Sequence, residues 1–299
     1  MLSVGIVAGA FKMDKVKNVH MVLSSLATNP YFIDVSVSSN RIAQGDTLLV
    51  VVHNEPNEVS GMLGEVPLHF SRTENGTDWI ALVGIAVTKK LGPYTLELTA
   101  PGKSSLKQKI SVFKRNFRVT PLAYTPELQQ KGFSAQELSN NIAEGEGKQL
   151  RALLNNITPT AYFSRPFINP LLIPFIITGA FGDIRQNGAV KVQHLGVDLG
   201  SPIGTSVIAA NTGKVVFEGN FPDYGNTLVI DHGLGIYSLY LHLSEFKVSE
   251  GQIVPQASII ALSGNTGYAI GPHLHFSIKI RGVAVDPLKF IYATQALPW

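Results

Sequence analysis

The chain has 299 residues, of which 45% are hydrophobic and only 15% charged, a composition typical of a folded globular protein with one large or two ordinary domains. Its net charge of +3 is too small to indicate nucleic-acid binding. The absence of cysteine excludes disulfides, cysteine nucleophiles and cysteine-ligated zinc. With 28 glycines and 17 prolines, the composition favours β structure with many turns.

Residues 1–30 form an N-terminal segment for which we consider a weak export signal or anchor. MLSVGIVAGAFK is apolar but has no basic residue before it, and KVKNVHMVLSSLA has lysines but a weak apolar core, so neither matches the usual pattern. No stretch of the chain approaches the roughly 20 apolar residues of a membrane span. The very apolar segment 167–181 is interrupted by prolines, and we expect buried strand or loop there.

Residues 31–115 show short alternating strands separated by turn signals. Asn75-Gly76 and Pro101-Gly102 each predict a tight turn between two strands. Several strands at this spacing predict an immunoglobulin-like β-sandwich that folds without the rest of the chain. No titratable groups cluster in this region.

Residues 116–165 are polar and rich in helix formers, so we expect a linker with one or two helices. Ser134 with Glu137 three residues later resembles a capping box. From residue 166 to residue 299, strand candidates return between Gly, Asn, Pro and Asp. We expect a second, all-β domain here, without a helix of convincing length.

Histidines concentrate in this second domain, where five of the eight lie between residues 194 and 275. His273 and His275 stand at i and i+2 of a predicted strand, so both rings face the same side. His194 precedes Asp198 by four residues, and this pair could be two metal ligands or only a hydrogen bond in a loop. His232, at a strand end, and the isolated His20, His53 and His69 are interpreted as structural.

His242 lies in the predicted strand YSLYLHLS. Strict alternation places His242 on one face with Ser238 and Tyr240, and the leucines on the other face, against an aliphatic core. We therefore expect His242 to face away from the core, toward the site or toward solvent.

His194, Asp198, His242, His273 and His275 together have the number and kind of groups that metal-assisted hydrolysis needs. A catalytic zinc ion takes three protein ligands and leaves one position open, and further histidines can move protons or stabilise an oxyanion. Without cysteine or a G-x-S-x-G motif, nucleophilic acyl transfer has no support.

The motifs H-x-x-x-D, Tyr-x-His-Leu and H-x-H, in this order over about residues 168–291, resemble the catalytic domain of the lysostaphin/LytM-type zinc metallopeptidases, which cleave cell-wall peptides. The segment FGDIRQNG is similar to the family's entry segment. The resemblance implies that His194, Asp198 and His275 bind zinc and that His242 and His273 are catalytic. It also implies a peptidoglycan peptide as substrate and a location outside the cytoplasm, in the periplasm or cell envelope. A departure is Pro255-Gln256-Ala257, where the family usually has a glycine.

Two alternatives remain from the sequence. One is a non-hydrolytic or autoinhibited wall-binding protein that activates other hydrolases, as some relatives without a full ligand set do. The other is a wall-binding protein with a structural metal, although a structural site would be closed by four ligands.

Overall fold

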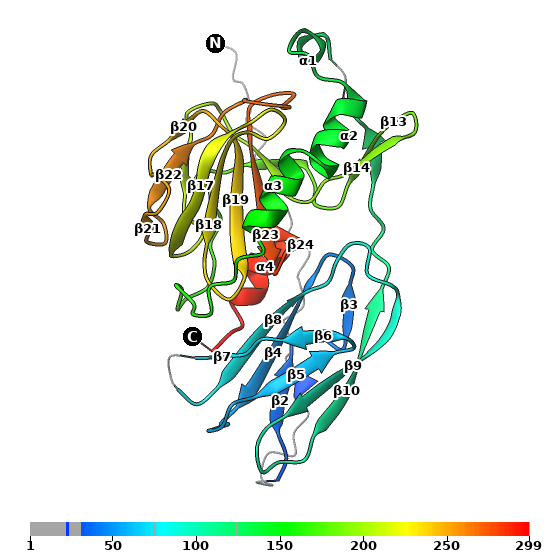
Figure 1. Cartoon of the computed structure of the whole chain (residues 1–299), viewed down its shortest axis with the longest axis vertical. Helices are drawn as coiled ribbons and strands as arrows, with labels where there is room; N and C mark the ends of the chain where they lie inside the picture. Colours follow the sequence, from blue (N-terminus) through cyan, green and yellow to red (C-terminus); the bar gives the residue numbers. More distant parts are fainter. Residues whose placement is uncertain (1–21, 24–30, 74–75, 124, 299) are drawn as a thin grey trace, which may run out of the picture.

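A computed structural model describes residues 22–23, 31–73, 76–123 and 125–298. Most of the N-terminal segment 1–30, and therefore the expected signal or anchor, lies outside the described residues. None of the helices in the described part of the chain is long and apolar enough to cross a membrane. The molecule in Figure 1 has two β-rich parts, with green helices running over one of them.

The first β-rich part contains two sheets that face each other across one apolar core. Val35, Val50, Leu96 and Ile110 are fully buried and come from both sheets. In the described part of the chain, one sheet has the order β1(Val22–Leu23), β2(Asp34–Val37), β4(Thr47–His53), β8(Trp79–Gly84), β7(Ser71–Arg72). The other has the order β3(Arg41–Ala43), β10(Leu106–Phe113), β9(Gly92–Thr99), β5(Ser60–Leu63), β6(Val66–Leu68). The β-sandwich is present, while its likeness to immunoglobulin domains stays a prediction.

The linker contains β11(Val119–Pro121) and three helices, α1(Pro126–Gln130), α2(Ala135–Ala143) and α3(Glu146–Leu153). Ser134 caps α2 as predicted, since its Oγ accepts a hydrogen bond from the Glu137 backbone N–H at 3.1 Å. Leu150 of α3 and Leu154, its C-cap, pack on Leu239 and Leu241 of a strand in the second β-rich part. Helix α3 therefore covers part of one face of the second β-rich part (Figure 1).

The second β-rich part is built around one large sheet. Among the described residues its order is β12(Ile176–Gly179), β15(Val197–Gly200), β23(His273–Ile280), β19(Ile236–Leu243), β18(Gly225–Asp231), β17(Gly213–Phe221), β21(Ile253–Val254), and β24(Val283–Val285) pairs with β23. Two smaller sheets flank it: β11-β13(Ile184–Asn187)-β14(Val190–Gln193) and β16(Ser206–Ile208)-β22(Ile259–Leu262)-β20(Glu245–Phe246). The mainly β fold class is confirmed.

Helix α4(Pro287–Thr294) follows the last strand and corrects the expectation of a second part without a convincing helix. Pro287 is its first residue, and Asp286 caps it through hydrogen bonds from the Leu288 and Lys289 backbone N–H groups. Strand alternation alone does not reveal this helix, whereas Asp286-Pro287 is a helix start signal.

The two β-rich parts share a buried contact. Leu297, just after α4, packs on Leu49, Val51 and Ile80 of the sandwich. Arg115 joins both sides as well, because its Nη2 lies 2.7 Å from Asp286 Oδ2 and its Nη1 lies 3.5 Å from an Asp46 oxygen. This contact positions the second part against one sheet of the sandwich.

The apolar segment 167–181 is only partly buried, which corrects the prediction that it is buried throughout. Phe167 and Leu171 are buried, but Leu172 is 77% exposed and Ile176 70% exposed. Ile176 lies on β12, the edge strand of the large sheet, and Leu172 lies before this strand.

Candidate metal centre

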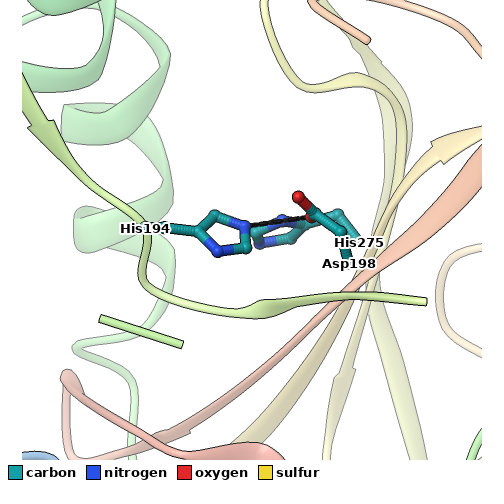
Figure 2. Close-up of side chains that lie close together, drawn as sticks. All are labelled: His194, Asp198 and His275. Carbon is teal, nitrogen blue, oxygen red and sulfur yellow. Dashed lines mark hydrogen bonds and ion pairs between the residues drawn. The ribbon is translucent and has the colours of Figure 1, made fainter. Parts of the chain in front are cut away.

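Three side chains converge between β14, β15 and β23. His194, Asp198 and His275 each offer one ligand atom, and these atoms all lie within 4.8 Å of one another (Figure 2). Asp198 Oδ1 lies 2.9 Å from His194 Nε2 and 2.8 Å from His275 Nδ1, and the two nitrogens are 3.0 Å apart. All three groups could therefore hold one small cation.

The sheet register brings the groups together. Asp198 on β15 is the direct cross-strand partner of His275 on β23. His194 lies in the loop before β15, where its backbone exchanges two hydrogen bonds with the turn at 182–183, at 2.7 and 2.8 Å. Three separate pieces of chain thus present their ligand atoms from fixed backbone positions.

The partners of the outer ring nitrogens assign the histidine tautomers. His194 Nδ1 lies 2.8 Å from the Ala180 carbonyl oxygen, which can only accept, so Nδ1 carries the proton. His275 Nε2 lies 3.0 Å from Ser277 Oγ, whose own proton goes to the Leu195 carbonyl, so this nitrogen donates as well. His194 Nε2, His275 Nδ1 and Asp198 Oδ1 are then three acceptors facing one another without a proton between them.

This arrangement fits a divalent metal ion. Three converging lone pairs repel one another unless a cation lies between them, and imidazole nitrogen with carboxylate oxygen is a ligand set that zinc accepts. Burial lowers the pKa of His275 to about 4, so its ring is neutral at neutral pH.

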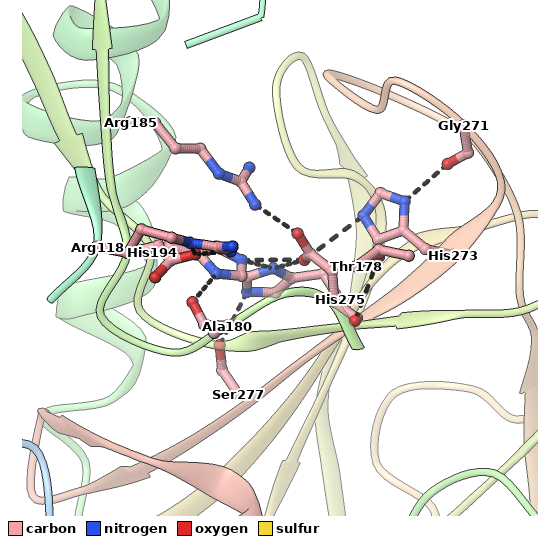
Figure 3. A network of polar contacts seen from close by, with 11 residues as sticks. Arg118, Thr178, Ala180, Arg185, His194, Gly271, His273, His275 and Ser277 are labelled. Carbon is pink, nitrogen blue, oxygen red and sulfur yellow. Dashed lines mark hydrogen bonds and ion pairs between the residues drawn. The ribbon is translucent and has the colours of Figure 1, made fainter. Parts of the chain in front are cut away.

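A second set of contacts surrounds the three groups (Figure 3). The Arg185 guanidinium pairs with Asp198 Oδ2, the oxygen that does not face the histidines. Two glycines leave room for these contacts: a Cβ at Gly196 would lie 2.4 Å from His275 Nε2, and one at Gly179 would lie 2.2 Å from Asp198 Oδ2. Side chains at either position would displace the site.

His242 and His273 complete the group. Their ring centroids are 4.8 Å apart, and the His242 ring lies 6.0 Å from that of His275. Each Nδ1 donates to a backbone carbonyl, that of Thr266 for His242 at 2.8 Å and that of Gly271 for His273 at 2.7 Å. Burial, with the neighbouring histidines, holds the pKa of His242 well below its ordinary value. All five residues selected from the sequence therefore lie together.

The route by which His242 reaches the site differs from the prediction. Tyr240 belongs to the main core, and Ser238 is fully buried with its Oγ 3.0 Å from the Tyr240 hydroxyl, whereas Leu239 and Leu241 lie under α3. Strict alternation would send His242 to the core with Tyr240. Instead a register shift interrupts the pairing of β18 with β19 before Leu243, and His242 has a φ of 61°, in the left-handed region. The sequence pattern contains no signal for this bulge.

The other described histidines lie outside the group. His232 is fully buried and binds the Thr212 carbonyl through Nδ1 at 2.8 Å, which agrees with its structural interpretation. His53 contacts Ser36 Oγ at 2.8 Å, and His69 is exposed, both in the sandwich. His20 lies outside the described residues.

Two cavities adjoin the centre. The first, here the roofed cavity, has a volume of about 130 Å³ and reaches from His194, His242 and His275 along the sheet to Ser277 and Lys279. Helices α2 and α3 contribute Leu138, Ile142 and Leu150 to its upper wall. The second, the arginine cavity, has a volume of about 460 Å³ and is lined by Arg118, Arg185, Asp198, Thr178 and His273, with no helix residue among its lining residues in the described part of the chain.

Two functional contacts were missed from the sequence. Ser277 stands two residues after His275, so strand periodicity could have placed it beside the ligand. Arg185 lies in the entry segment FGDIRQNG, but its pairing with Asp198 depends on the β13–β14 hairpin and has no local signal.

Comparison with known proteins agrees with this geometry. Residues 192–287 match the model of peptidase family M23. Peptidoglycan DD-endopeptidase ShyA of Vibrio cholerae is 46% identical over 115 residues, which are 38% of this chain and 27% of the relative. DD-carboxypeptidase/endopeptidase Mpg of Neisseria meningitidis is 39% identical over 104 residues, or 35% of this chain and 24% of the relative. The matches span about a quarter of the length of these relatives.

A crystal structure of a peptidase M23 from Pseudomonas aeruginosa is 28% identical, covers 81% of this chain and 92% of its own, and superposes with a TM-score of 0.58. The fold and the convergent ligand set are thus those of a peptidase domain with a candidate metal site. Residues 192–287 of the chain are therefore identified as a peptidase M23 domain.

Proposed function

We propose that the protein is a zinc-dependent endopeptidase that hydrolyses peptide bonds in peptidoglycan. The observation that carries the proposal is the convergence of three lone pairs from His194, Asp198 and His275 beside two further histidines. Relatives named as peptidoglycan DD-endopeptidases support the choice of substrate.

In this proposal His194 Nε2, Asp198 Oδ1 and His275 Nδ1 hold the metal. A bound zinc ion supplies Lewis-acid polarisation of the scissile carbonyl and of water. Ser277 and the Ala180 carbonyl keep the two ligand rings in the tautomers that expose a lone pair. The second oxygen of Asp198 stays with Arg185 and keeps the carboxylate oriented.

His242 and His273 transfer protons. Because each Nδ1 donates to a carbonyl, each Nε2 can accept a proton from water and return it to the leaving amine. The lowered pKa of His242 keeps this ring neutral and able to accept. The net reaction adds one water across the peptide bond and yields a carboxylate and an amine.

The test is digestion of purified peptidoglycan by the metal-free chain during a zinc titration, with mass analysis of the released fragments. We expect release of peptide-linked fragments to rise with zinc up to about one ion per chain and to vanish in His275→Ala. His69→Ala, which changes an exposed sandwich histidine, is the matched control and should behave as the wild type. Zinc binding without any released fragment would overturn the proposed peptidase function. It would favour the alternative, a non-hydrolytic wall-binding protein that activates other hydrolases.

The substrate also implies where the protein works. We propose a location in the periplasm or cell envelope, because peptidoglycan lies outside the cytoplasm. Cell fractionation with an antibody against the chain should recover it with envelope or periplasmic markers. Recovery only with cytosolic markers would contradict the wall-hydrolase function.

A further inference from the structure

Lys279 stands in the roofed cavity without a partner. The side chains of residues 273, 275, 277 and 279 lie on the same face of β23. Lys279 therefore lines the roofed cavity on the same face as His275 and Ser277. Its ammonium group makes no hydrogen bond or ion pair with any residue that the structure describes. A half-buried cation without a counter-ion is costly unless a ligand supplies the missing negative charge.

The charges around Lys279 favour an anion as that ligand. The neighbouring charge that acts on Lys279 is the positive one of Arg151, on α3. Burial and then this cation lower the pKa of Lys279 to about 8, so the group is still mostly protonated at neutral pH. Asp223 also lines the cavity, but its carboxyl lies beside that of Glu146 and is not among the charges that act on Lys279. Aliphatic side chains form a large part of the remaining lining, among them Leu239 and Leu241 of β19 and Leu150 of α3, and Arg185 adds a second cation.

The size of the cavity favours the end of a chain as the anion. Its volume of about 130 Å³ has room for a few heavy atoms, and residues of α2 and α3 line it. A peptide has a negative charge at its C-terminal end and a positive charge at its N-terminal end. An end held near Lys279 is therefore a C-terminal carboxylate, which lies on the leaving-amine side of the scissile bond.

Strand geometry sets the length of the leaving segment. Four residues of β23 separate His275 from Lys279, a distance of about 13 Å between backbones. The lysine side chain spans part of this distance, and an extended peptide covers about 3.3–3.6 Å per residue. We propose that Lys279 binds a free carboxylate on the leaving side of the substrate, one to about three residues from the scissile bond. This inference rests on the proposed peptidase function and makes the enzyme selective for short leaving segments, including a single terminal residue.

The test compares two soluble substrates with the zinc-loaded full chain. One is a stem pentapeptide ending in D-alanyl-D-alanine with a free carboxylate, and the other is the same peptide with a C-terminal carboxamide. We expect the wild type to favour the free acid by about 10- to 100-fold in kcat/KM, mainly through KM, since a charge-assisted hydrogen bond is lost with the amide. Water adds across the peptide bond before the last alanine, which leaves a tetrapeptide carboxylate and releases D-alanine from the acid or D-alaninamide from the amide.

Variants assign the preference to the lysine. Lys279→Met should reduce the acid-to-amide ratio to about 1, and Lys279→Arg should restore most of it because it keeps the positive charge. Lys214→Met, at an exposed position of β17, is the matched control and should leave the ratio unchanged. Because the acid-to-amide comparison in the wild type needs no variant, a misfolded Lys279→Met does not prevent the test.

The outcomes distinguish the two proposals. If the wild type releases no fragments from peptidoglycan or from either peptide, the proposed peptidase function fails. If it digests peptidoglycan but cleaves acid and amide equally, or if Lys279→Met keeps the wild-type ratio, only the assignment of Lys279 is overturned.

Discussion

At the residue scale, the candidate metal centre depends on groups that hold the outer atoms of its ligands. His194, Asp198 and His275 each use one atom toward the site and one toward a fixed neighbour. His242 and His273, which we propose transfer protons, are not among these three ligands. A variant can therefore affect metal binding without being a proton-transfer variant, and the reverse. Ligand and catalytic residues can therefore be separated by experiment although they lie within one cluster.

The first prediction concerns this separation. Alanine at His194, Asp198 or His275 should remove metal and activity together, because three ligands are the minimum set for catalytic zinc. Alanine at His242 or His273 should leave close to one zinc per chain but lower the rate by about 10²–10⁴-fold. Elemental analysis beside peptidoglycan hydrolysis measures both. Loss of zinc from His242→Ala together with its retention in His275→Ala would reverse the assigned roles.

Ser277 carries the second prediction at this scale. Ser277→Ala removes the acceptor of the His275 Nε2 proton and should weaken zinc binding by about 10- to 100-fold, as loss of a ligand's hydrogen-bond partner typically does. Competition with a chromogenic chelator gives the affinity. Ser249→Ala, an exposed serine, should retain wild-type affinity. An unchanged affinity in Ser277→Ala would show that the ring is held without this contact.

At the element scale, α3 is held on the sheet by a carboxyl contact as well as by leucines. Glu146 begins α3, and its Oε2 accepts a hydrogen bond from the Asp223 backbone N–H at 3.1 Å. Both side chains are buried, and Glu146 Oε1 and Asp223 Oδ2 have no hydrogen-bond partner among the residues that the structure describes. Burial, and then the Asp223 carboxyl, raise the pKa of Glu146 to about 7.

This contact predicts a pH dependence. Since the folded pKa of Glu146 lies above its ordinary value of 4.5, the folded state keeps a proton that the unfolded state has lost. Stability should therefore fall as pH rises from about 4.5 to about 7. Glu146→Gln should not show this loss of stability. The difference between its melting temperature and that of the wild type should therefore increase as pH rises from about 4.5 to about 7. Glu144→Gln, an exposed neighbour, is the control. Parallel melting curves for Glu146→Gln and the wild type would contradict the assignment.

Local sequence patterns predict some of the elements and some of the candidate site, but not all of them. The β-rich character, the capped helix at Ser134 and the shared face of His273 and His275 follow from local periodicity and capping, which adjacent residues encode. The position of His242 does not, because a bulge and a left-handed residue override alternation. The covering of the sheet by α2 and α3 depends on contacts over about 90 residues of chain, such as that of Leu150 with Leu239, and no local pattern specifies it.

At the scale of the whole molecule, we still propose the boundaries 31–115, 116–165 and 166–299 for the sandwich, linker and peptidase domain. Linker residues from Val119 on contribute to the peptidase part, since β11 pairs in parallel with β13. The sandwich also buries Leu49, Val51 and Ile80 against the segment after α4. We expect the sandwich to fold alone, but with this apolar patch uncovered.

The final prediction tests that contact. Leu297 is 5% exposed, and Leu297→Ala should lower the free energy of unfolding of the full chain by about 2–5 kcal/mol, as cavity-forming core substitutions do. Ile253→Ala, at a side chain that is 63% exposed, should change it by less than about 0.5 kcal/mol. Denaturant unfolding gives both values. Equal stability of Leu297→Ala and the wild type would mean that the two parts are not packed together in solution.

The place of β23 in the large sheet has a consequence for the order of biosynthesis. β15 and β19 leave the ribosome first, and β23 then inserts between them and brings His275 to Asp198, 77 residues behind it in the chain. Until that insertion, His194 and Asp198 have no third ligand. We therefore expect an unfinished chain to bind zinc poorly and to be unable to cut peptides, so metal capture marks the completion of folding.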